Sequence, residues 1–262
     1  MSGNNSKTSK IGERFTTNEG YEIIIIDYIN ANNVWIEFQD KYKNKKKVYY
    51  SQCKLGTIKN EYHPSVQGVG FIGVGKYKTK ENGKMTKCYM TWINVLTRTH
   101  DEEFKNKRST YIDARIDESW YNYQVFAEWY YNNYYEIEGE TMCLDKDILY
   151  KGNKEYAPDK CIFVPNRINV LFIKSDIMRG DFPIGVSYDK RGRKYMAQCQ
   201  TIDNENNRHN KFLGYYNVPH EAFLAYKEFK EAYIKQVADE YKDKIPQRLY
   251  DAMYAWTVEE DD

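Results

Sequence analysis

Residues 144–169 read LDKDILYKGNKEYAPDKCIFVPNRIN, and this stretch decides the expected fold in the centre of the chain. Its first segment, LDKDIL, predicts a strand, and the Gly- and Asn-containing segment YKGNKEYAPDK predicts a loop. The apolar run CIFVP predicts a second strand, and NRINVLF predicts the opening of a helix. We therefore expect two strands followed by a helix, and an ordinary hairpin with a helix is the structural alternative.

A polar tail and three regions are distinguished by composition and periodicity. Residues 1–10 predict a disordered tail, which is no secretory leader because no apolar run follows it. Residues 11–60 predict a small antiparallel β-barrel or sheet. Residues 61–178 contain the strand–strand–helix unit with flanking helices, and residues 179–262 predict a three-stranded sheet packed on a helix. The expected fold class is therefore α+β, with more than one domain.

In the first region, YEIIIIDYINANNVWIEFQD (21–40) predicts two strands around an Asn-rich hairpin turn at 30–33. The segment KKKVYYSQCKLG (45–56) predicts a third strand. Five lysines crowd this part of the chain, namely Lys41, Lys43, Lys45, Lys46 and Lys47. Two interpretations of these lysines stay open, a solvated loop and a patch that contacts phosphates.

In the second region, the Gly-rich residues 68–89 predict a linker and a hairpin, because the GxGxxG pattern of a phosphate-binding loop is absent. Helical spacing of apolar residues predicts helices within 89–99 and 117–136. Asp117 or Ser119 is the expected N-cap of the second helix. In the first helix Met90, Ile93 and Leu96 or Thr97 recur at helical spacing, and in the second Trp120, Phe126 and Trp129 or Tyr130 are expected to be buried. Both helices are expected to be scaffold.

In the third region, strands are predicted at GVSYD (185–189), KYMAQCQTI (194–202) and KFLGYYN (211–217), with polar turns between them. Pro219 then occupies the first turn of a long helix. The apolar face of this helix is expected to lie across the sheet and comprises Ala222, Ala225, Tyr226, Phe229 and Tyr233. A short helix is predicted to restart after Pro246.

Composition narrows the possible functions only weakly. The 262 residues carry a formal net charge of +1, so global charge argues neither for nor against nucleic acid. Residues 101–159 carry 14 Asp and Glu against 7 Lys and Arg, so the middle of the chain is acidic. The five Cys lie far apart without a CxxC pair, which argues against zinc and indicates free thiols in a reducing cytoplasm. The apolar run at 23–26 is too short to span a membrane.

Residues 185–230 contain the segments GVSYD, KYMAQCQ and KFLGYYNVPHEAFLAYKEF. This pattern resembles the plant ethylene-response-factor (Apetala-type) DNA-binding domain, which also occurs in phage homing endonucleases, although it is poorer in arginine. The resemblance implies that the sheet enters the major groove of double-stranded DNA. The residues then expected to contact DNA are Arg191, Arg193, Lys194, Tyr195, Gln198, Gln200 and Lys211. The sequence leaves open which face of the sheet meets DNA.

The stretch 144–169, placed upstream of such a sheet, resembles the HNH (His-Me-finger) unit of phage homing endonucleases. That unit cleaves DNA with one divalent metal ion, such as Mg²⁺. The resemblance implies Asp145 and Asn169 as metal ligands. Lys146 stands where the family has its base histidine, and Lys160 stands where it has an asparagine. Because a lysine is a poor base and repels a cation, a degenerate nuclease that keeps its fold is expected.

Two further possibilities concern the chemistry of this stretch. An active nuclease would need another base, and His100 is the candidate. Asp147 follows Asp145 at the i, i+2 spacing that puts both carboxylates on one side of a strand. With Asp159 nearby, they could bind a hard cation, and a solvated acidic loop is the alternative. The candidate catalytic residues are therefore Asp145, Lys146, Asp147 and His100.

Three functions follow as hypotheses. The first is a phage-type DNA-binding protein derived from an HNH homing endonuclease, with an inactive nuclease centre, in the cytoplasm of a bacterial host cell. The second is an active, metal-dependent endonuclease that nicks DNA. The third is a counter-defence protein whose acidic middle binds a basic host protein. Double-stranded DNA is the expected partner in the first two, no membrane is expected in any, and the oligomeric state stays open.

Overall fold

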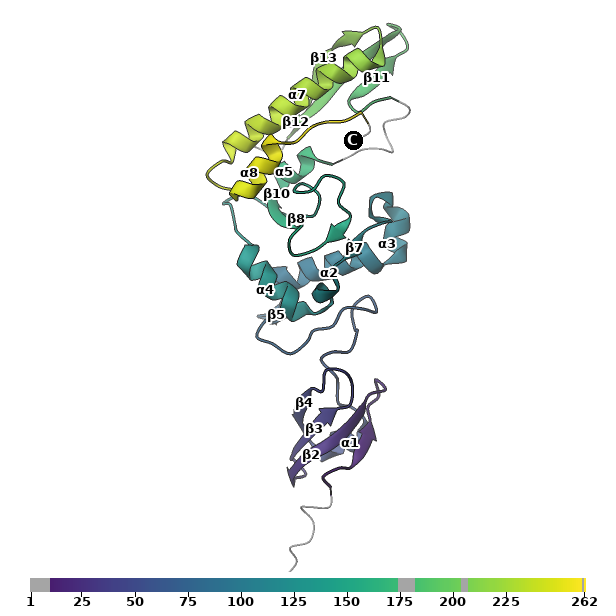
Figure 1. The fold of residues 1–262 in the computed structure, drawn as a ribbon, viewed down its shortest axis with the longest axis vertical. Coiled ribbons are helices and arrows are strands. Elements are labelled where there is room, and N and C mark those ends of the chain that lie inside the picture. The colour runs from purple at the N-terminus through teal and green to yellow at the C-terminus, as the bar shows by residue number, and fades with distance from the viewer. Residues whose placement is uncertain (1–9, 174–181, 204–206, 261) are drawn as a thin grey trace, which may run out of the picture. The chain divides into compact units, whose positions relative to one another are not determined.

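The computed structural model describes residues 10–173, 182–203, 207–260 and 262. The chain combines α-helices with several small β-sheets, as an α+β fold, and divides into two compact units (Figure 1). One unit comprises Met1–Ile112 and Ile116–Tyr131, and the other comprises Asp113–Arg115 and Asn132–Asp262. The boundary expected at 60–61 lies inside the first unit, and the boundary expected at 178–179 falls outside the described residues.

The first unit begins with an antiparallel sheet of four strands in sequential order. These strands are β1 (Arg14–Thr16), β2 (Glu22–Asn30), β3 (Asn33–Phe38) and β4 (Lys45–Val48). Alternate residues of β2 and β3 point into a core that includes Ile23, Ile25, Val34, Ile36 and Phe38. The hairpin turn falls where the sequence predicts it. Among the described strands the sheet stays open, so the sheet expectation holds and the barrel alternative does not.

The third strand that the sequence predicts in this region corresponds to β4 and ends earlier than expected. β4 stops at Val48, and helix α1 (Tyr50–Leu55) follows directly. At the start of this helix, Gln52 Oε1 accepts a hydrogen bond from the backbone N–H of Tyr49 at 2.9 Å. Gly56 ends the helix with a φ of 65°, which glycine adopts without strain. The strand predicted through KKKVYYSQCKLG is therefore wrong in its second half, because both ends of a helix are capped locally.

Helices make up the rest of the first unit, after a small hairpin. In order, the elements are β5 (Lys80–Glu81), β6 (Lys84–Met85), α2 (Lys87–His100), α3 (Glu102–Lys107), two 3₁₀ helices (Ser109–Tyr111 and Glu118–Tyr121) and α4 (Tyr123–Asn133). The helix expected over 117–136 is thus divided at Asn122, and Asp117 caps its first part. Trp92 and Trp120 are fully buried, and Trp92 Nε1 donates to the backbone O of Trp120 at 2.6 Å. This hydrogen bond joins α2 to the segment before α4.

The second unit contains the strand–strand–helix order that its sequence predicts. β8 (Met142–Asp145) pairs antiparallel with β10 (Ile162–Pro165), and α5 (Asn166–Leu171) follows at once. The loop between the two strands contains β9 (Glu155–Tyr156), which pairs with β7 (Arg115–Ile116). The first strand ends at its aspartate and does not run through residue 149, so the rest of LDKDIL forms a turn.

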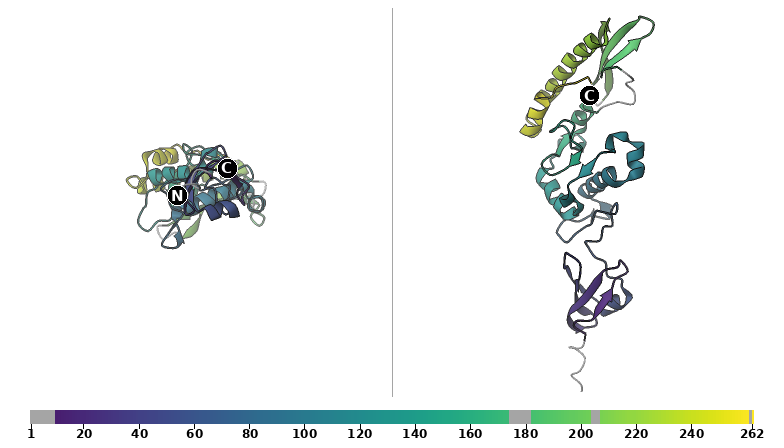
Figure 2. Two further views of the ribbon diagram at one scale, coloured as in Figure 1. Left: turned by 90° about the horizontal axis from the view of Figure 1, so that it is seen from below. Right: turned by 45° about the vertical axis from the view of Figure 1, so that its right-hand side comes forward.

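A three-stranded sheet and two helices complete the second unit. The sheet is antiparallel in the order β11 (Val186–Asp189), β12 (Lys194–Ile202), β13 (Arg208–Tyr216). Helix α7 (Pro219–Glu240) lies along this sheet, and α8 (Gln247–Tyr254) packs beside α7 (Figure 2). These strands, the start of α7 at its proline and the restarted helix confirm the segments that the sequence predicts.

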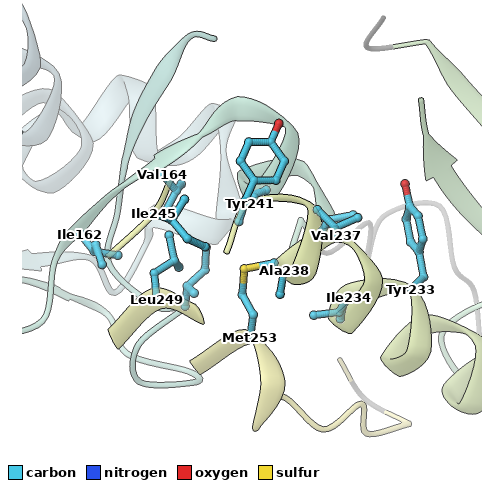
Figure 3. Close-up of a cluster of buried hydrophobic side chains, with 13 residues drawn as sticks. Ile162, Val164, Tyr233, Ile234, Val237, Ala238, Tyr241, Ile245, Leu249 and Met253 are labelled. Atoms are coloured by element: carbon cyan, nitrogen blue, oxygen red, sulfur yellow. The ribbon is translucent and has the colours of Figure 1, made fainter. Parts of the chain in front are cut away.

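The strand–strand–helix segment and the C-terminal helices share one hydrophobic core. Figure 3 shows Ile162 and Val164 of β10 in a cluster with apolar side chains of α7 and α8, including Val237 and Leu249. The first turns of α7 instead cover the sheet, through Ala222 and its neighbours. A 22-residue helix is about 33 Å long. α7 therefore contacts two layers in succession, which explains why both fall in one compact unit.

Candidate functional site

Strand β8 ends in a tight acidic turn that begins at Asp145. Asp145 Oδ1 accepts hydrogen bonds from the backbone N–H groups of Asp147 at 2.8 Å and Ile148 at 2.7 Å. Burial, and after it the charge of Asp147, raises the pKa of Asp145 to about 7, although the two N–H groups and Lys146 act in the opposite direction. The carboxyl group therefore holds the turn and is a weaker acid than an exposed aspartate.

Lys146 is buried inside this turn, with 8% of its surface exposed. Its Nζ donates to Asp147 Oδ2 at 3.0 Å and to the backbone O of Asn153 at 3.1 Å. It also lies 6.0 Å from the centroid of the Tyr156 ring. A protonated lysine offers three donors and no acceptor. The position where the resemblance expects a base therefore holds a cation that stabilises the turn.

Asn153 closes the turn, and the sequence reasoning missed it. Its Nδ2 donates to the backbone O of Lys146 at 2.7 Å and of Glu155 at 2.8 Å, and its Oδ1 accepts from the N–H of Glu155 at 3.2 Å. Asn153 thus holds the loop, while Lys160, where the resemblance expects an asparagine, pairs with Glu155. The Gly152–Asn153 pair was the available signal, since both residue types are favoured in turns.

The donor set of this turn fits a divalent metal poorly. Asn169 lies on α5 and is half-buried, and Asp159 is exposed on the loop. Asp147 follows the end of β8, so the shared strand face expected for it and Asp145 does not form. Within the described ranges, no group of three or more His, Cys, Asp or Glu side chains could hold a metal ion. An ion between the two aspartates would also meet the Lys146 Nζ, which is already bonded there.

His100, the other candidate base, ends α2 in the first unit. Its Nδ1 lies 2.9 Å from the Thr99 hydroxyl, and its Nε2 lies 3.4 Å from the Tyr121 hydroxyl. Burial, and after it the charge of Lys105, lowers the pKa of His100. Asp145 belongs to the second unit. The contacts within its own unit account for the half-buried position of this imidazole.

The C-terminal sheet has one covered face and one open face. Ala197 and Cys199 of β12 are almost fully buried and belong to a core cluster with Ala222 and Tyr226 of α7. Because side chains alternate along a strand, the residues between them point to the other face. We define the open face as Lys194, Met196 and Gln198 of β12 together with Phe212 and Tyr215 of β13.

Phe212 and Tyr215 are part of the open face that the sequence reasoning did not single out. Their side chains are 53% and 49% exposed, and their ring centroids lie 5.1 Å apart. Phe212 is opposite Gln198, and Tyr215 is opposite Met196, so cross-strand pairing brings all four together. Strict alternation in KFLGYY would place Phe212 and Tyr215 on opposite faces, and the register shift between Ala197 and Gln198, which brings them to one face, cannot be read from the sequence.

The other expected DNA contacts are divided between several places. Arg191 and Arg193 are exposed in the turn before β12, next to Lys194, so three cations gather at one end of the sheet. Lys211 is exposed on β13 opposite Cys199, on the side of α7. Tyr195 also lies on the covered side, where it packs against the rings of Phe182 and Tyr188. The structure thus groups the turn cations and Gln198 with the open face, apart from Tyr195 and Lys211 on the covered side.

Gln200 lies further along β12, at the rim of a cavity. The cavity has a volume of about 340 Å³, and Gln198, Lys230 of α7 and Trp256 also line it. Burial lowers the pKa of Lys230. Gln200 is exposed and, two positions after Gln198 on the same strand, points to the same face of the sheet, so both glutamines stay candidate base readers beside this cavity.

The lysine-rich loop of the first unit is partly engaged within the chain. Lys46 pairs with Glu61, and Lys45 Nζ lies 3.6 Å from a Glu37 carboxylate oxygen. Lys43 Nζ donates to Gln39 Oε1 at 3.1 Å. The exposed lysines of this loop are Lys41, Lys43, Lys45 and Lys47. Both interpretations of the loop stay open, but intramolecular partners reduce the charge that it offers to phosphates.

No helix within the described ranges is long and apolar enough to cross a membrane. Comparison with protein-family models, with curated proteins and with solved structures finds no match to this chain. The two family resemblances therefore rest on the motifs quoted above alone.

Proposed function

We propose that the chain is a double-stranded-DNA-binding protein of the phage homing-endonuclease type, in which the C-terminal sheet contacts DNA and the turn after β8 no longer cleaves it. The observation that carries the DNA-binding part is the open face. Helix α7 covers one side of the sheet, while the other side presents Lys194, Gln198 and two aromatic rings. A sheet with one free face can enter the major groove of DNA.

Charge around the sheet supports this proposal. The sequence from 182 to 216 has six Lys and Arg against three Asp and Glu, in contrast to the acidic residues 101–159. Arg191 and Arg193, in the turn beside Lys194, are exposed and can contact phosphates next to the groove that the sheet enters. The positive charge therefore gathers at the end of the sheet where Lys194 of the open face lies, while Lys211 lies on the covered side.

The contacts of the turn after β8 support the loss of hydrolysis. A general base must accept a proton, and the Nζ of Lys146 donates hydrogen bonds to Asp147 and to the backbone of Asn153. A metal ligand must offer free lone pairs, and Asp145 Oδ1 already accepts two backbone hydrogen bonds. These groups stabilise the fold of the turn, and the proposal assigns them that role alone.

Fluorescence anisotropy with a 30-bp random-sequence duplex tests DNA binding. The full chain should bind, and log Kd should depend linearly on log salt concentration, with a slope of about 0.9 per phosphate contacted. Arg193→Ala and Lys194→Ala should each weaken binding and lower the slope by about one. Lys235→Ala removes the same charge from an exposed position on α7 and should change neither. Absence of binding at low salt would refute the DNA-binding part.

Plasmid nicking tests the loss of hydrolysis separately. Supercoiled plasmid is incubated with the full chain and Mg²⁺ or Mn²⁺, and no nicked or linear product is expected. Asp145→Ala serves as the matched variant. Metal-dependent cutting by the wild-type chain that disappears in Asp145→Ala would establish an active nuclease and overturn this part, whatever the result of the binding assay.

A further inference from the structure

The open face of the C-terminal sheet is unusually apolar for a surface beside a cluster of cations. Phe212, Tyr215 and Met196 form a continuous patch, because Tyr215 is opposite Met196 and the two rings lie 5.1 Å apart. About half of the surface of each ring is exposed. The two rings are not part of the covered hydrophobic core, because α7 packs on the opposite side of the sheet.

The chemistry of the patch selects among base pairs. In the major groove the C5-methyl group of thymine is the one apolar group that a base presents, and apolar side chains contact it. A glutamine can donate to N7 and accept from N6 of adenine, and Gln198 stands opposite Phe212 in the sheet. Guanine, by contrast, is read by Arg or Lys in bidentate contact. The described residues of the open face include one such side chain, Lys194, at its end.

The arginines nearby are placed for another task. Arg191 and Arg193 lie in the turn between β11 and β12, beyond the end of the strand pair. The backbone N–H of Arg191 donates to Asp189 Oδ1 at 3.0 Å, which fixes the turn. These side chains therefore lie beyond one end of the apolar patch, where they are placed to contact phosphates at one edge of a groove.

We propose that the open face reads A·T base pairs in the major groove, with Phe212, Tyr215 and Met196 against thymine methyl groups and Gln198 on adenine. This inference rests on the proposed DNA binding and adds the class of DNA sequence that is bound. Each thymine methyl group in contact contributes roughly a fourfold gain in affinity, the value of one buried methylene.

Selection from a 20-bp random-sequence duplex pool tests the inference with the full chain. Sequencing of the bound fraction should show enrichment of A·T pairs over two or more adjacent positions. A second pool in which deoxyuridine replaces thymidine lacks only the C5-methyl groups and should bind roughly fourfold more weakly per methyl contacted. Equal binding of both pools, or enrichment of G·C pairs, would overturn the inference while DNA binding stands. Binding of neither pool would remove the proposed function and this inference together.

Variants separate the methyl contacts from general affinity. In Phe212→Ala and Tyr215→Ala the ratio of affinities for the thymidine and deoxyuridine pools should fall toward one, while salt-dependent binding remains. Phe212→Leu keeps an apolar side chain and should keep most of the ratio. Tyr188→Ala removes a 40% exposed ring on the covered side of the sheet and should leave the ratio unchanged. A ratio unaffected by Phe212→Ala and Tyr215→Ala would refute the assignment of these two rings.

Discussion

Replacement of Lys146 by methionine tests the role of the buried cation in the turn after β8. The lysine side chain is 10% exposed, and its Nζ bonds to Asp147 Oδ2 and to the backbone O of Asn153. Methionine keeps most of the apolar stem and fills much of the same volume, so the variant removes mainly the charge and the two hydrogen bonds. The free energy of unfolding of the second unit should therefore fall.

The size of the effect follows from the two partners of Lys146. A hydrogen bond to a charged group contributes about 1.5–3 kcal/mol, and the lower end applies because the Asp147 side chain is 44% exposed and can be hydrated again. Loss of the donor to the buried carbonyl of Asn153 adds about 1 kcal/mol. The expected loss is about 2–3 kcal/mol at pH 8. At pH 5 it should be smaller, since Asp145, whose pKa is raised to about 7, is then protonated and needs less compensation.

Urea-induced unfolding, with hydrogen exchange of peptides from residues 140–171, measures this loss where it occurs. Lys160→Met is the matched control, because Lys160 pairs with Glu155 at the half-exposed end of the same loop. Its unfolding free energy should stay within experimental error of the wild-type value. The reasoning is refuted if Lys146→Met is as stable as the wild-type chain at pH 8, or if its loss of stability does not shrink at pH 5.

Three further changes test other parts of the second unit. Between pH 4 and pH 7 the wild-type unfolding free energy should fall, because the pKa of Asp145 is raised from 3.8 to about 7 and its carboxyl group keeps a proton in the folded state that it releases in the unfolded state. In Asp145→Asn this fall, at most about 4 kcal/mol, should disappear from urea titrations. Asn153→Ala removes three hydrogen bonds and should cost about 3 kcal/mol, seen as faster amide exchange in residues 144–156. Gly185→Ala would place a Cβ atom 2.1 Å from Tyr226 at a φ of 75°, and should cost about 2–4 kcal/mol in the thermal unfolding of the chain.

Local patterns in the sequence predict most of the elements correctly. The spacing of apolar residues in 89–99 corresponds to α2, and Pro219 begins α7 as predicted. These elements follow from periodicity and from the fixed φ of proline, which act over a few residues. The second half of 45–56 was wrong, because the alternation that favours a strand competes there with caps at both ends of a short helix.

The candidate site is predicted less completely than the elements. The sequence singled out the neighbours Asp145 and Lys146, and the structure shows that both side chains make hydrogen bonds that hold one turn. It did not single out Asn153, because an asparagine after a glycine is ordinary in any loop. Phe212 and Tyr215 were also missed, since their face depends on a register shift between neighbouring strands. DNA binding, cleavage and the host cell stay predictions.

The sequence by itself determined most strands and helices of the second unit, the acidic residues within LDKDIL and the excess of basic over acidic residues between 182 and 216. These properties depend on side chains within a few positions of one another, so a linear pattern contains them. Only the tertiary structure decided that Lys146 is buried as a cation and that α7 covers the Ala197 face of the sheet. It also decided that α7 and β10 share one core. Burial and the choice of sheet face depend on segments far apart in the chain. Because α7 packs on the Ala197 face, the opposite face, which carries Phe212 and Tyr215, stays exposed.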